Sequence, residues 1–314
     1  MRILTLTAIM TCAVACAEGQ DADRLTRNAV LRYWSAFALM SDAEPVGRPS
    51  NANASFAELL QATESGASPW DERIAPLLDR NAAALATLAR GTRLPDCDWG
   101  LDYELGASAP IPHHAKARAL ARLNTLASIR ALAGGKGDEA VKGWLVGLRF
   151  ALDIGCGETL HGTMTAASAL RSTLGSVERA AAQGRLTAAQ RARVAEGIRA
   201  LSDTVFDWGR AFLNDIRALE TSVTRARSDA AYRKEFALGQ LPSTADSKWY
   251  AREVEQLADA LGRSPESADP VITAFEADTS VPEFYRRWSP SPKPVNAMRR
   301  DIRALRQRVL AALK

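Results

Sequence analysis

Residues 187–219 decide the fold class, and they read TAAQRARVAEGIRALSDTVFDWGRAFLNDIRAL. Thr187 and Gln190 match the T-x-x-Q capping box that begins many helices. Apolar residues then recur every three or four positions, at Val194, Ile198, Leu201, Val205, Trp208, Phe212, Ile216 and Leu219. At 3.6 residues per turn, this spacing predicts one long helix whose apolar face meets a core over about six turns.

Other segments repeat this pattern between loops rich in Gly, Pro, Ser and Asp. Further helices are expected at residues 21–40, 55–65, 69–90 (capped by Ser68), 113–132, 138–154, 159–183, 246–261, 269–277 and 296–313. An interior proline removes a hydrogen bond, so Pro76 predicts a later start or a kink in the third of these helices. No segment shows the sustained alternation of a strand. The sequence therefore predicts an all-α protein without a sheet, either an antiparallel helical bundle or an irregular α-solenoid.

The N-terminal residues have the three parts of a secretory signal. Arg2 precedes a short apolar run that ends in the small residues Ala15, Cys16 and Ala17. The run is too short for a membrane span, which needs roughly 20 apolar residues. We therefore expect residues 1–17 to be a signal peptide and the mature chain to be exported to the periplasm or cell envelope.

Two interpretations of the cleavage site remain open. The sequence Ala15-Cys16-Ala17 fits an A-x-A site, with cleavage before Glu18 and release of a soluble protein. Residues 13–16 also resemble a bacterial lipobox, although the first position lacks Leu. In that second case Cys16 would become the N-terminus and carry a lipid anchor.

The rest of the chain divides into three predicted regions. They are a helical domain at residues 18–288, a Pro-rich extended connector at residues 289–295 and an amphipathic helix at residues 296–314. The last helix surrounds an apolar stripe with arginines. The stripe predicts docking on the preceding helices, and the alternative is an anionic membrane surface.

The charge balance argues against a nucleic-acid partner, and the hydropathy argues against a membrane span. Lys and Arg number 40 against 36 Asp and Glu, for a net charge of +4. This balance is too mild to indicate nucleic-acid binding. No later segment is long and apolar enough to predict a transmembrane span.

Cleavage before Glu18 leaves two cysteines, Cys97 and Cys156. An exported protein meets an oxidising compartment, where two thiols often pair. The sequence therefore predicts a disulfide between them, provided that the geometry permits it. Two separate thiols are the alternative.

Residues 119–132 and 138–153 resemble one tetratricopeptide-type helical hairpin. Small residues stand where that repeat needs close contact between helices, at Ser128, Gly135, Ala140 and Gly147. The resemblance covers about 34 residues, which is one period of the repeat, and no second copy follows. It implies a groove between helices that could take a protein or peptide partner.

Three stretches resemble landmarks of uncharacterised exported α-helical bacterial proteins. They are NAVLRYWSAF at residues 28–37, CDWGLDYE at residues 97–104 and PHHAKAR at residues 112–118. The resemblance spans about the first half of the chain. It implies a helical fold and a cell-envelope setting, and it implies no activity.

The loop at residues 96–104 is the first candidate site, because it combines carboxylates with aromatic rings. The carboxylates are Asp96, Asp98, Asp102 and Glu104, and the rings are those of Trp99 and Tyr103. They could hold a hard cation or work as an acid/base pair. The loop departs from an EF-hand, however. Gly100 replaces an oxygen ligand, Leu101 takes the place of the invariant glycine, and Ala107 stands where the bidentate Glu belongs. The alternative is a structural loop whose rings fill the core and whose carboxylates cap helices or pair with Arg.

Histidines form the second candidate site. His113 and His114 begin one predicted helix and His161 begins another. With a carboxylate such as Glu158 or Asp102, they could supply the three or four ligands of a zinc site. No H-E-x-x-H motif is present. The alternative is a set of polar residues at helix ends.

No catalytic motif settles the function, since G-x-S-x-G, P-loop, S-x-x-K and C-x-x-C-H patterns are all missing from the sequence. We expect a non-catalytic exported scaffold that binds a protein or peptide partner and needs no cofactor. The alternative is a metal-dependent or carboxylate-based hydrolase that uses the 96–104 loop and the helix-end histidines. The candidate binding residues are Asp98, Trp99, Asp102, Tyr103, Glu104, His113 and His114, and no residue is assigned a catalytic role.

Overall fold

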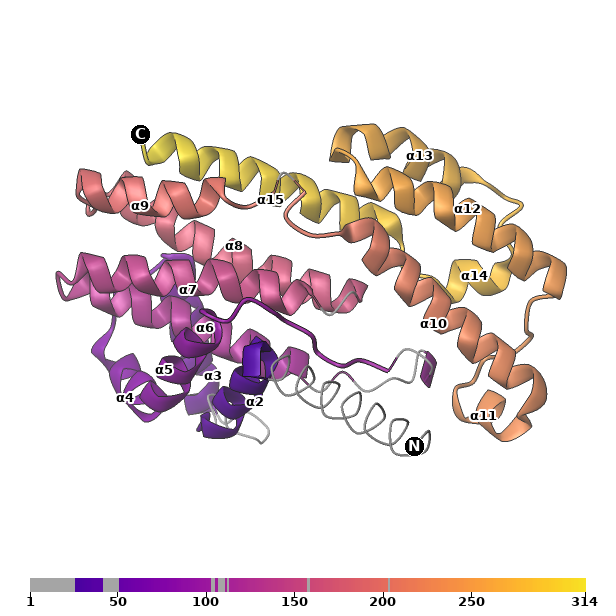
Figure 1. Ribbon diagram of the computed structural model, residues 1–314, viewed down its shortest axis with the longest axis horizontal. Helices are drawn as coiled ribbons and strands as arrows, with labels where there is room; N and C mark the ends of the chain where they lie inside the picture. The colour runs from indigo at the N-terminus through magenta and orange to yellow at the C-terminus, as the bar shows by residue number, and fades with distance from the viewer. Residues whose placement is uncertain are drawn as a thin grey trace, which may run out of the picture.

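The computed structural model describes residues 26–41, 51–102, 105–106, 111, 113–156, 159–202 and 204–314. Helices make up nearly all of the regular structure of these residues, and no strand is assigned among them. A single isolated bridge pairs Asn28 with Asp96. The all-α prediction is therefore confirmed (Figure 1).

The first group of helices carries the candidate sites. It comprises α2 (Ala29–Leu39), α3 (Asn51–Ser65), the 3₁₀ helix η1 (Glu72–Ile74), α4 (Ala75–Arg80), α5 (Ala82–Gly91), α6 (His113–Ala133), α7 (Gly137–Gly155), α8 (Leu160–Ala182) and α9 (Ala188–Arg199). The helix α7 packs between α6 and α8, while α2 packs on α5. The long helices α6, α7 and α8 thus form the centre of this group.

The second group lies beside the first in Figure 1. It comprises α10 (Trp208–Ser228), α11 (Ala230–Glu235), α12 (Thr244–Gly262), α13 (Pro265–Ala277) and α14 (Glu283–Trp288). The last helix, α15 (Pro292–Ala312), runs along one edge of the molecule and joins the two groups (Figure 1). It contacts α8 and α9 in the first group and α13 in the second.

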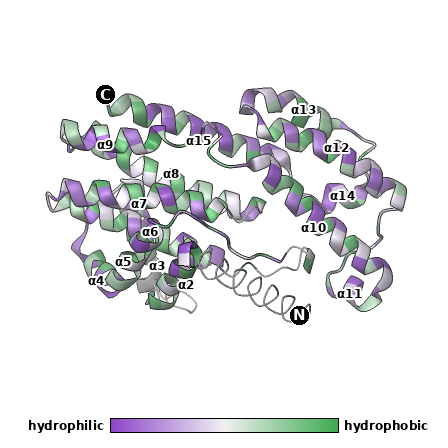
Figure 2. Ribbon diagram, viewed as in Figure 1, coloured by the Kyte–Doolittle hydropathy of each residue, from purple (hydrophilic) through white to green (hydrophobic). Residues whose placement is uncertain are grey.

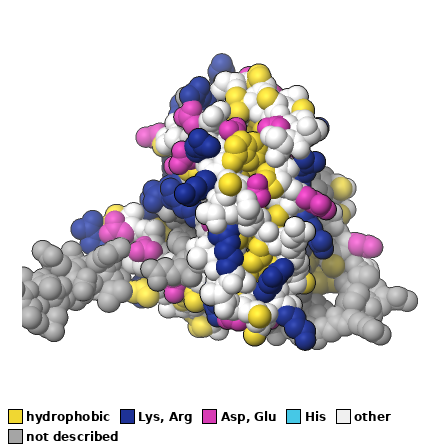
Figure 3. Space-filling view, turned by 90° about the vertical axis from the view of Figure 1, so that its right-hand side faces the viewer, with side chains coloured by type: hydrophobic (Ala, Val, Ile, Leu, Met, Phe, Trp, Pro, Cys, Tyr) yellow, Lys and Arg dark blue, Asp and Glu magenta, His cyan; other side chains and the backbone are white. Residues whose placement is uncertain are grey.

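The core runs through both groups. Hydrophobic and hydrophilic residues alternate along the helices, as in α10 and α12 (Figure 2), and this is the pattern of helices that bury one face. The buried faces form one large hydrophobic cluster, which includes Tyr33, Trp144 and Trp208. A smaller cluster lies between α3, α4 and α6 around Leu60, Ile74 and Leu123. At the end of the molecule built by the second group, the surface mixes hydrophobic and charged side chains (Figure 3).

The prediction of one long helix from Thr187 to Leu219 is wrong. The capping box of Thr187 and Gln190 is present, but α9 ends at Arg199 and α10 begins only at Trp208. The Asp207 side chain caps the new helix by accepting from the backbone N–H of Arg210. Between the helices, Val205 has a φ of 60°, a left-handed conformation that a helix cannot contain.

Prolines set two other boundaries. Asp71, not Ser68, caps the segment before α4, and Pro76 lies in the first turn of that helix. The last helix begins at Pro292 instead of Asn296, so the extended connector predicted at residues 289–295 ends before residue 292. Both corrections have one cause: the first N–H groups of a helix have no partner inside it, so a proline there removes no hydrogen bond.

The C-terminal helix and α2 differ in how fully they bury their apolar residues. In the C-terminal helix, Ile302, Leu305 and Val309 are buried, so the predicted docking of its apolar stripe is confirmed. In α2, Trp34 is 39% exposed, whereas Tyr33 and Phe37 of the same helix are buried. The helix α2 begins at Ala29 after its N-cap Asn28, and residues 21–25 of the predicted helix lie outside the described residues.

The helices α6 and α7 form the antiparallel hairpin that the sequence predicts. Small residues bring the two helices close together, since a Cβ on Gly143 would lie 2.2 Å from the Ser128 hydroxyl. A Cβ on Gly147 would meet Asn124 of α6 and Thr173 of α8. The likeness of this hairpin to a tetratricopeptide repeat stays a prediction.

The signal peptide predicted at residues 1–17, with Cys16, lies outside the described residues. Among the helices that the structure describes, none is long and apolar enough to cross a membrane.

Candidate functional site

The segment at residues 94–102 is fastened to the start of α2 by Asn28. The Asn28 side chain caps α2 by accepting from the Val30 N–H at 3.1 Å. The same side chain donates to the Asp98 carbonyl at 2.9 Å and accepts from the Asp98 N–H at 3.1 Å. The Asn28 side chain therefore fixes the loop against the N-terminus of α2.

Asp153, near the end of α7, is the hub beneath this loop, and its side chain is almost fully buried. Its carboxylate accepts from the Tyr33 hydroxyl of α2 and, at 2.9 Å, from Arg149 Nε. Its backbone carbonyl accepts from Trp99 Nε1 at 2.7 Å and from Cys97 Sγ at 3.2 Å. Helix α2, the loop and α7 thus meet at one residue.

Arg149 balances the buried carboxylate. Its Nη2 also donates to the carbonyl oxygens of Pro95 at 3.0 Å and Leu94 at 3.2 Å. Burial raises the pKa of the Asp153 carboxyl, although the hydrogen bonds from Tyr33 and Arg149 oppose that shift. Burial and then Asp153 raise the pKa of the Tyr33 phenol, so the proton stays on Tyr33. The two hydrogen bonds offset part of the cost of burying the Asp153 carboxyl, and the arrangement suits a structural link better than a proton donor.

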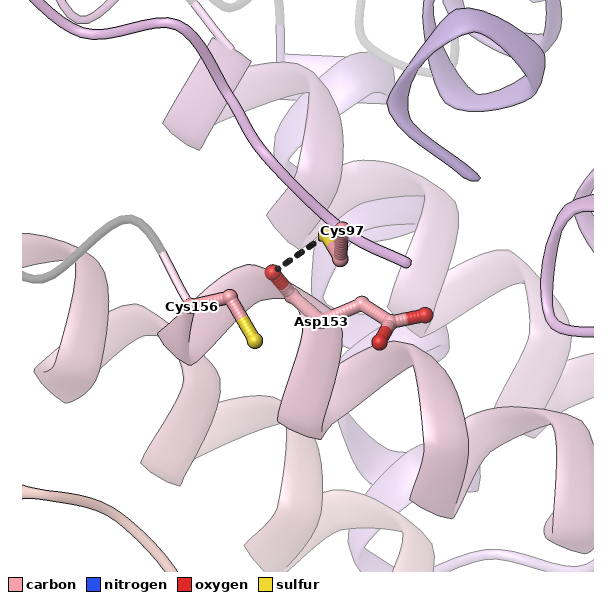
Figure 4. Close-up of side chains that lie close together, drawn as sticks. All are labelled: Cys97, Asp153 and Cys156. Carbon is pink, nitrogen blue, oxygen red and sulfur yellow. Dashed lines mark hydrogen bonds between the residues drawn. The ribbon is translucent and has the colours of Figure 1, made fainter. Parts of the chain in front are cut away.

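The two predicted disulfide partners come together at this hub. Cys97 lies in the loop and Cys156 at the end of α7, with Asp153 between them (Figure 4). The structure records both as thiols, and the two Sγ atoms and an Asp153 carboxylate oxygen all lie within 4.8 Å of one another. The hydrogen bond with Cys156, and then burial, raise the pKa of the Cys97 thiol. The disulfide stays a prediction.

The same three residues are the only group of close His, Cys, Asp or Glu ligand atoms in the described part of the chain. Two thiolates and one carboxylate could bind a zinc ion. The Asp153 carboxylate, however, is already held by Tyr33 and Arg149. A bound cation would also lie close to the Arg149 guanidinium, so these contacts favour a thiol pair over a metal centre.

The three histidines gather beside the loop. The His113 ring stacks on Trp99 at 4.1 Å between centroids and meets His114 edge-on at 4.3 Å. The His114 ring stacks on His161 of α8 at 4.9 Å. The histidines of α6 and α8 therefore lie close together, in a row of rings from the buried Trp99 to the exposed His161.

Burial keeps the first two imidazoles neutral. His113 is 1% exposed and His114 is 3% exposed. Desolvation lowers the pKa of His113 to about 4 and is the main cause that lowers the pKa of His114 to about 3. Nε2 of His113 and both nitrogens of His114 are buried without a hydrogen-bond partner in the described structure.

The acidic residues of the loop do not join the histidines. Asp98 is exposed and accepts from the Gly100 N–H at 2.9 Å, while Asp96 is exposed and pairs with Arg27 at 3.2 Å. Asp102 is exposed as well. Trp99 instead turns inward and fills the core. Tyr103, Glu104 and Glu158 lie outside the described residues.

Sequence reasoning missed the hub itself. Tyr33 appeared only within the landmark stretch at residues 28–37, and Asp153 only as the last residue of the predicted hairpin. The one local signal was the spacing of Arg149 and Asp153, which places an ion pair on a helix face at i, i+4. The Tyr33–Asp153 contact joins residues 120 positions apart, and no local pattern predicts it.

A second feature is an open groove between α3, α8 and α15, with a volume of about 550 Å³. Its floor on α8 carries Ser168, Ser172 and Gly175 at helical spacing, and Ala304 of α15 lies opposite. The walls carry three arginines and two acidic residues, a balance of +1: Arg171, Arg179, Arg308, Glu64 and Asp301.

An ion pair and two hydrogen bonds join the helices of this groove. Arg171 of α8 lies 3.4 Å from Asp301 of α15. Glu64 of α3 accepts from Ser172 of α8 at 2.5 Å, and its backbone carbonyl accepts from Arg179. The groove therefore has fixed walls and a floor of small side chains.

Comparison with known proteins gives no relative: no family model matches the chain, and no curated protein or solved structure shows significant similarity to it. Its function therefore has to be inferred from its own geometry.

Proposed function

We propose that the protein is a non-catalytic helical scaffold that binds an acidic segment of a protein partner in the α3/α8/α15 groove. The observation that carries this proposal is the groove itself. Its volume of about 550 Å³ falls in the range of ligand-binding clefts. The small residues Ser168, Ser172 and Gly175 leave room for the backbone of a partner segment on the floor.

Charge favours an acidic partner. The lining carries one more arginine than carboxylates, and the side chains of Arg171 and Arg308 are 47% and 60% exposed. Each of them makes an ion pair with one carboxylate, but an arginine has five N–H donors and can hold a second acceptor. Arginines at the rim of a groove attract and orient an acidic segment.

The binding test uses two fluorescein-labelled helical peptides of equal length, one rich in Glu and Leu and the other with Lys in place of Glu. We expect the acidic peptide to bind about tenfold more tightly, which corresponds to roughly 1.4 kcal/mol. Fluorescence anisotropy at low and moderate salt measures both affinities. Equal binding of the two peptides would contradict the proposal.

A matched pair of variants locates the binding. Ser168→Trp places a large ring on the groove floor, and Ser168 is exposed, so the fold tolerates the change. Ala182→Trp places the same ring at the exposed end of α8, outside the groove. We expect the first variant to lose the acidic peptide and the second to keep it. Retained binding by Ser168→Trp would move the site elsewhere.

The hydrolase alternative has less support. The three imidazoles gather, which favours it, but Asp98 and Asp102 remain exposed at the surface. The His114 ring stacks on the His161 ring instead of converging with it on one point. A zinc site needs ligand atoms about 2 Å from a common centre.

Export is the second part of the proposal and rests on Arg2, the apolar run and the small residues before Glu18. Intact mass of the protein recovered from the producing cell tests it. Cleavage before Glu18 gives a soluble form, whereas a diacylated Cys16 gives a heavier, membrane-bound form. A chain that keeps Met1 would contradict export.

A further inference from the structure

Four arginines line a small pocket where the start of α10, the start of α13 and the middle of α15 meet. They are Arg263, Arg299, Arg303 and Arg306, and Thr204 and Ser264 add hydroxyl groups. The pocket has a volume of about 190 Å³ and no acidic residue in its lining. It is separate from the α3/α8/α15 groove, since the two share no lining residue.

Arg299 gives the pocket a buried positive charge. The residue is 5% exposed. It donates to Asn296 Oδ1 at 2.7 Å and to the backbone carbonyl of Arg263, and both acceptors are uncharged. Burial lowers the pKa of Arg299 to about 10, so the guanidinium still carries its proton at neutral pH. A buried charge is costly unless an opposite charge compensates it.

The nearby carboxylates bind other arginines. Arg303 lies 2.6 Å from Glu266, Arg300 pairs with Asp269, and Arg263 pairs with Asp259. These acidic side chains are 43–63% exposed and lie outside the pocket lining.

The remaining arginine of the lining is held by backbone groups. Arg306 donates to the carbonyl oxygens of Ser202 at 2.8 Å and Leu201 at 2.7 Å. With Arg300, five arginines therefore face three carboxylates in this region, which leaves a local charge of +2.

The start of α13 adds to the same field. Ser264 caps this helix of 13 residues, and Pro265 occupies its first turn, so the positive end of the helix lies at the pocket wall. Backbone N–H groups at such an end favour an anion, and arginine forks match the oxygens of a phosphate.

We propose that this arginine pocket binds a phosphate group, carried either by free inorganic phosphate or by a phosphomonoester. The local charge of +2 matches the dianion. The pocket is smaller than the roughly 300–1,000 Å³ of clefts for drug-sized ligands, so the phosphoryl group itself is the part that enters. A larger molecule would extend from the pocket mouth.

The experiment titrates the full chain with sodium phosphate by calorimetry, against sodium chloride at equal ionic strength. Two arginines of α15 give a matched pair of variants, because both side chains are 45% exposed and each has one carboxylate partner. Arg303 lines the pocket and Arg300 does not. We expect Arg303→Gln to weaken phosphate binding about fivefold, and Arg300→Gln to change it less than about twofold.

The outcomes decide the proposal. Heat from phosphate that equals the heat from chloride overturns it, and so does an equal loss of affinity in the two variants, which would indicate nonspecific attraction to a basic helix. Phenyl phosphate distinguishes the two sources: binding as tight as that of inorganic phosphate supports a carried phosphoryl group. Binding of inorganic phosphate alone supports the free ion.

Discussion

At the scale of single residues, Asp153 shows how one buried residue can organise three segments. Its carboxylate holds Tyr33 and Arg149, and its carbonyl holds Trp99 and Cys97. Each bond is worth about 1 kcal/mol net, but a buried carboxylate left without partners would cost several times more. The hydrogen bonds of Asp153 therefore depend on one another, and the loss of one partner weakens the remaining bonds.

The burial of His113 predicts how the stability of the fold depends on pH. The unfolded chain protonates a histidine near pH 6.5, whereas burial lowers the pKa of His113 in the folded protein to about 4. The unfolded state binds more protons between these values, so stability is lost as the pH falls from about 6.5 to about 4. His113→Phe keeps a ring against Trp99 and removes the titration. We expect the slope of unfolding free energy with pH to fall by about 1.4 kcal/mol per pH unit.

Urea unfolding across this pH range, by fluorescence, measures both slopes. The difference between the two proteins above about pH 7 gives the effect of packing alone, because His113 is neutral in both states there. His114 remains in the variant and keeps its own share of the slope. Identical slopes in the two proteins would show that His113 is not neutral in the folded state.

At the scale of elements, the break between α9 and α10 shows what periodicity cannot decide. The apolar residues from Val194 to Leu219 keep helical spacing across the break, because Ile198 and Trp208 both face the core. Ser202 and Asp207 bond readily to nearby backbone and favour caps over helix interiors. Asp207 does form the N-cap of α10. The sequence therefore contains a local signal for the break, but the continuous apolar stripe hides it.

Local signals predict most of the helices and little of the site. The Thr187–Gln190 box uses contacts within three residues, and it appears in the structure. The Asp153 hub joins residues 54 to 120 positions apart, so only the packed fold brings them together. The arginine pocket likewise depends on where α13 crosses α15, which no stripe on either helix reveals.

Gly209 tests the packing of two elements. A Cβ at this position, near the start of α10, would lie 2.3 Å from the Ala258 carbonyl oxygen of α12. The backbone cannot yield as a side chain can, so Gly209→Ala must push the helices apart. We expect a loss of about 1–3 kcal/mol of stability, measured by urea unfolding.

Gly262, at the end of α12, supplies the control. A Cβ there meets nothing within 4 Å. Alanine is also the better helix former, so Gly262→Ala should leave stability unchanged or raise it by up to about 1 kcal/mol. A Gly209→Ala protein as stable as this control would mean that α10 and α12 do not approach as closely as the structure shows.

At the scale of the whole molecule, the helix α15 holds distant parts of the chain together. The helix α15 docks Ile302, Leu305 and Val309 into the core and contacts helices of both groups. Arg306 adds hydrogen bonds from α15 to the carbonyls that follow α9. The thiols of Cys97 and Cys156 offer a second connection, which would close a loop of about 60 residues around α6 and α7.

A disulfide at this position would act on the whole chain, because it restricts the unfolded ensemble. For a loop of about 60 residues, the chain-entropy relation gives a stabilisation of about 4 kcal/mol. Cys97 would give up its hydrogen bond to the Asp153 carbonyl, a cost of about 1 kcal/mol or less. In the reaction, the two thiols give two electrons and two protons to oxidised glutathione. The Cys97 and Cys156 Sγ atoms form a bond, and the glutathione disulfide is reduced to two molecules of glutathione.

We expect the oxidised protein to weigh two hydrogens less, to resist alkylation at both cysteines and to unfold at a higher urea concentration than the reduced protein. Cys156→Ser removes the exposed thiol while leaving the Cys97 bond to Asp153, so reductant should no longer shift its unfolding. The mass shows only that the disulfide has formed. Its stabilisation has to appear in the midpoint of urea unfolding, because strain in the folded state could offset the entropic gain. Alkylation of both cysteines after treatment with oxidised glutathione would show that the thiols, although within 4.8 Å, cannot reach bonding geometry.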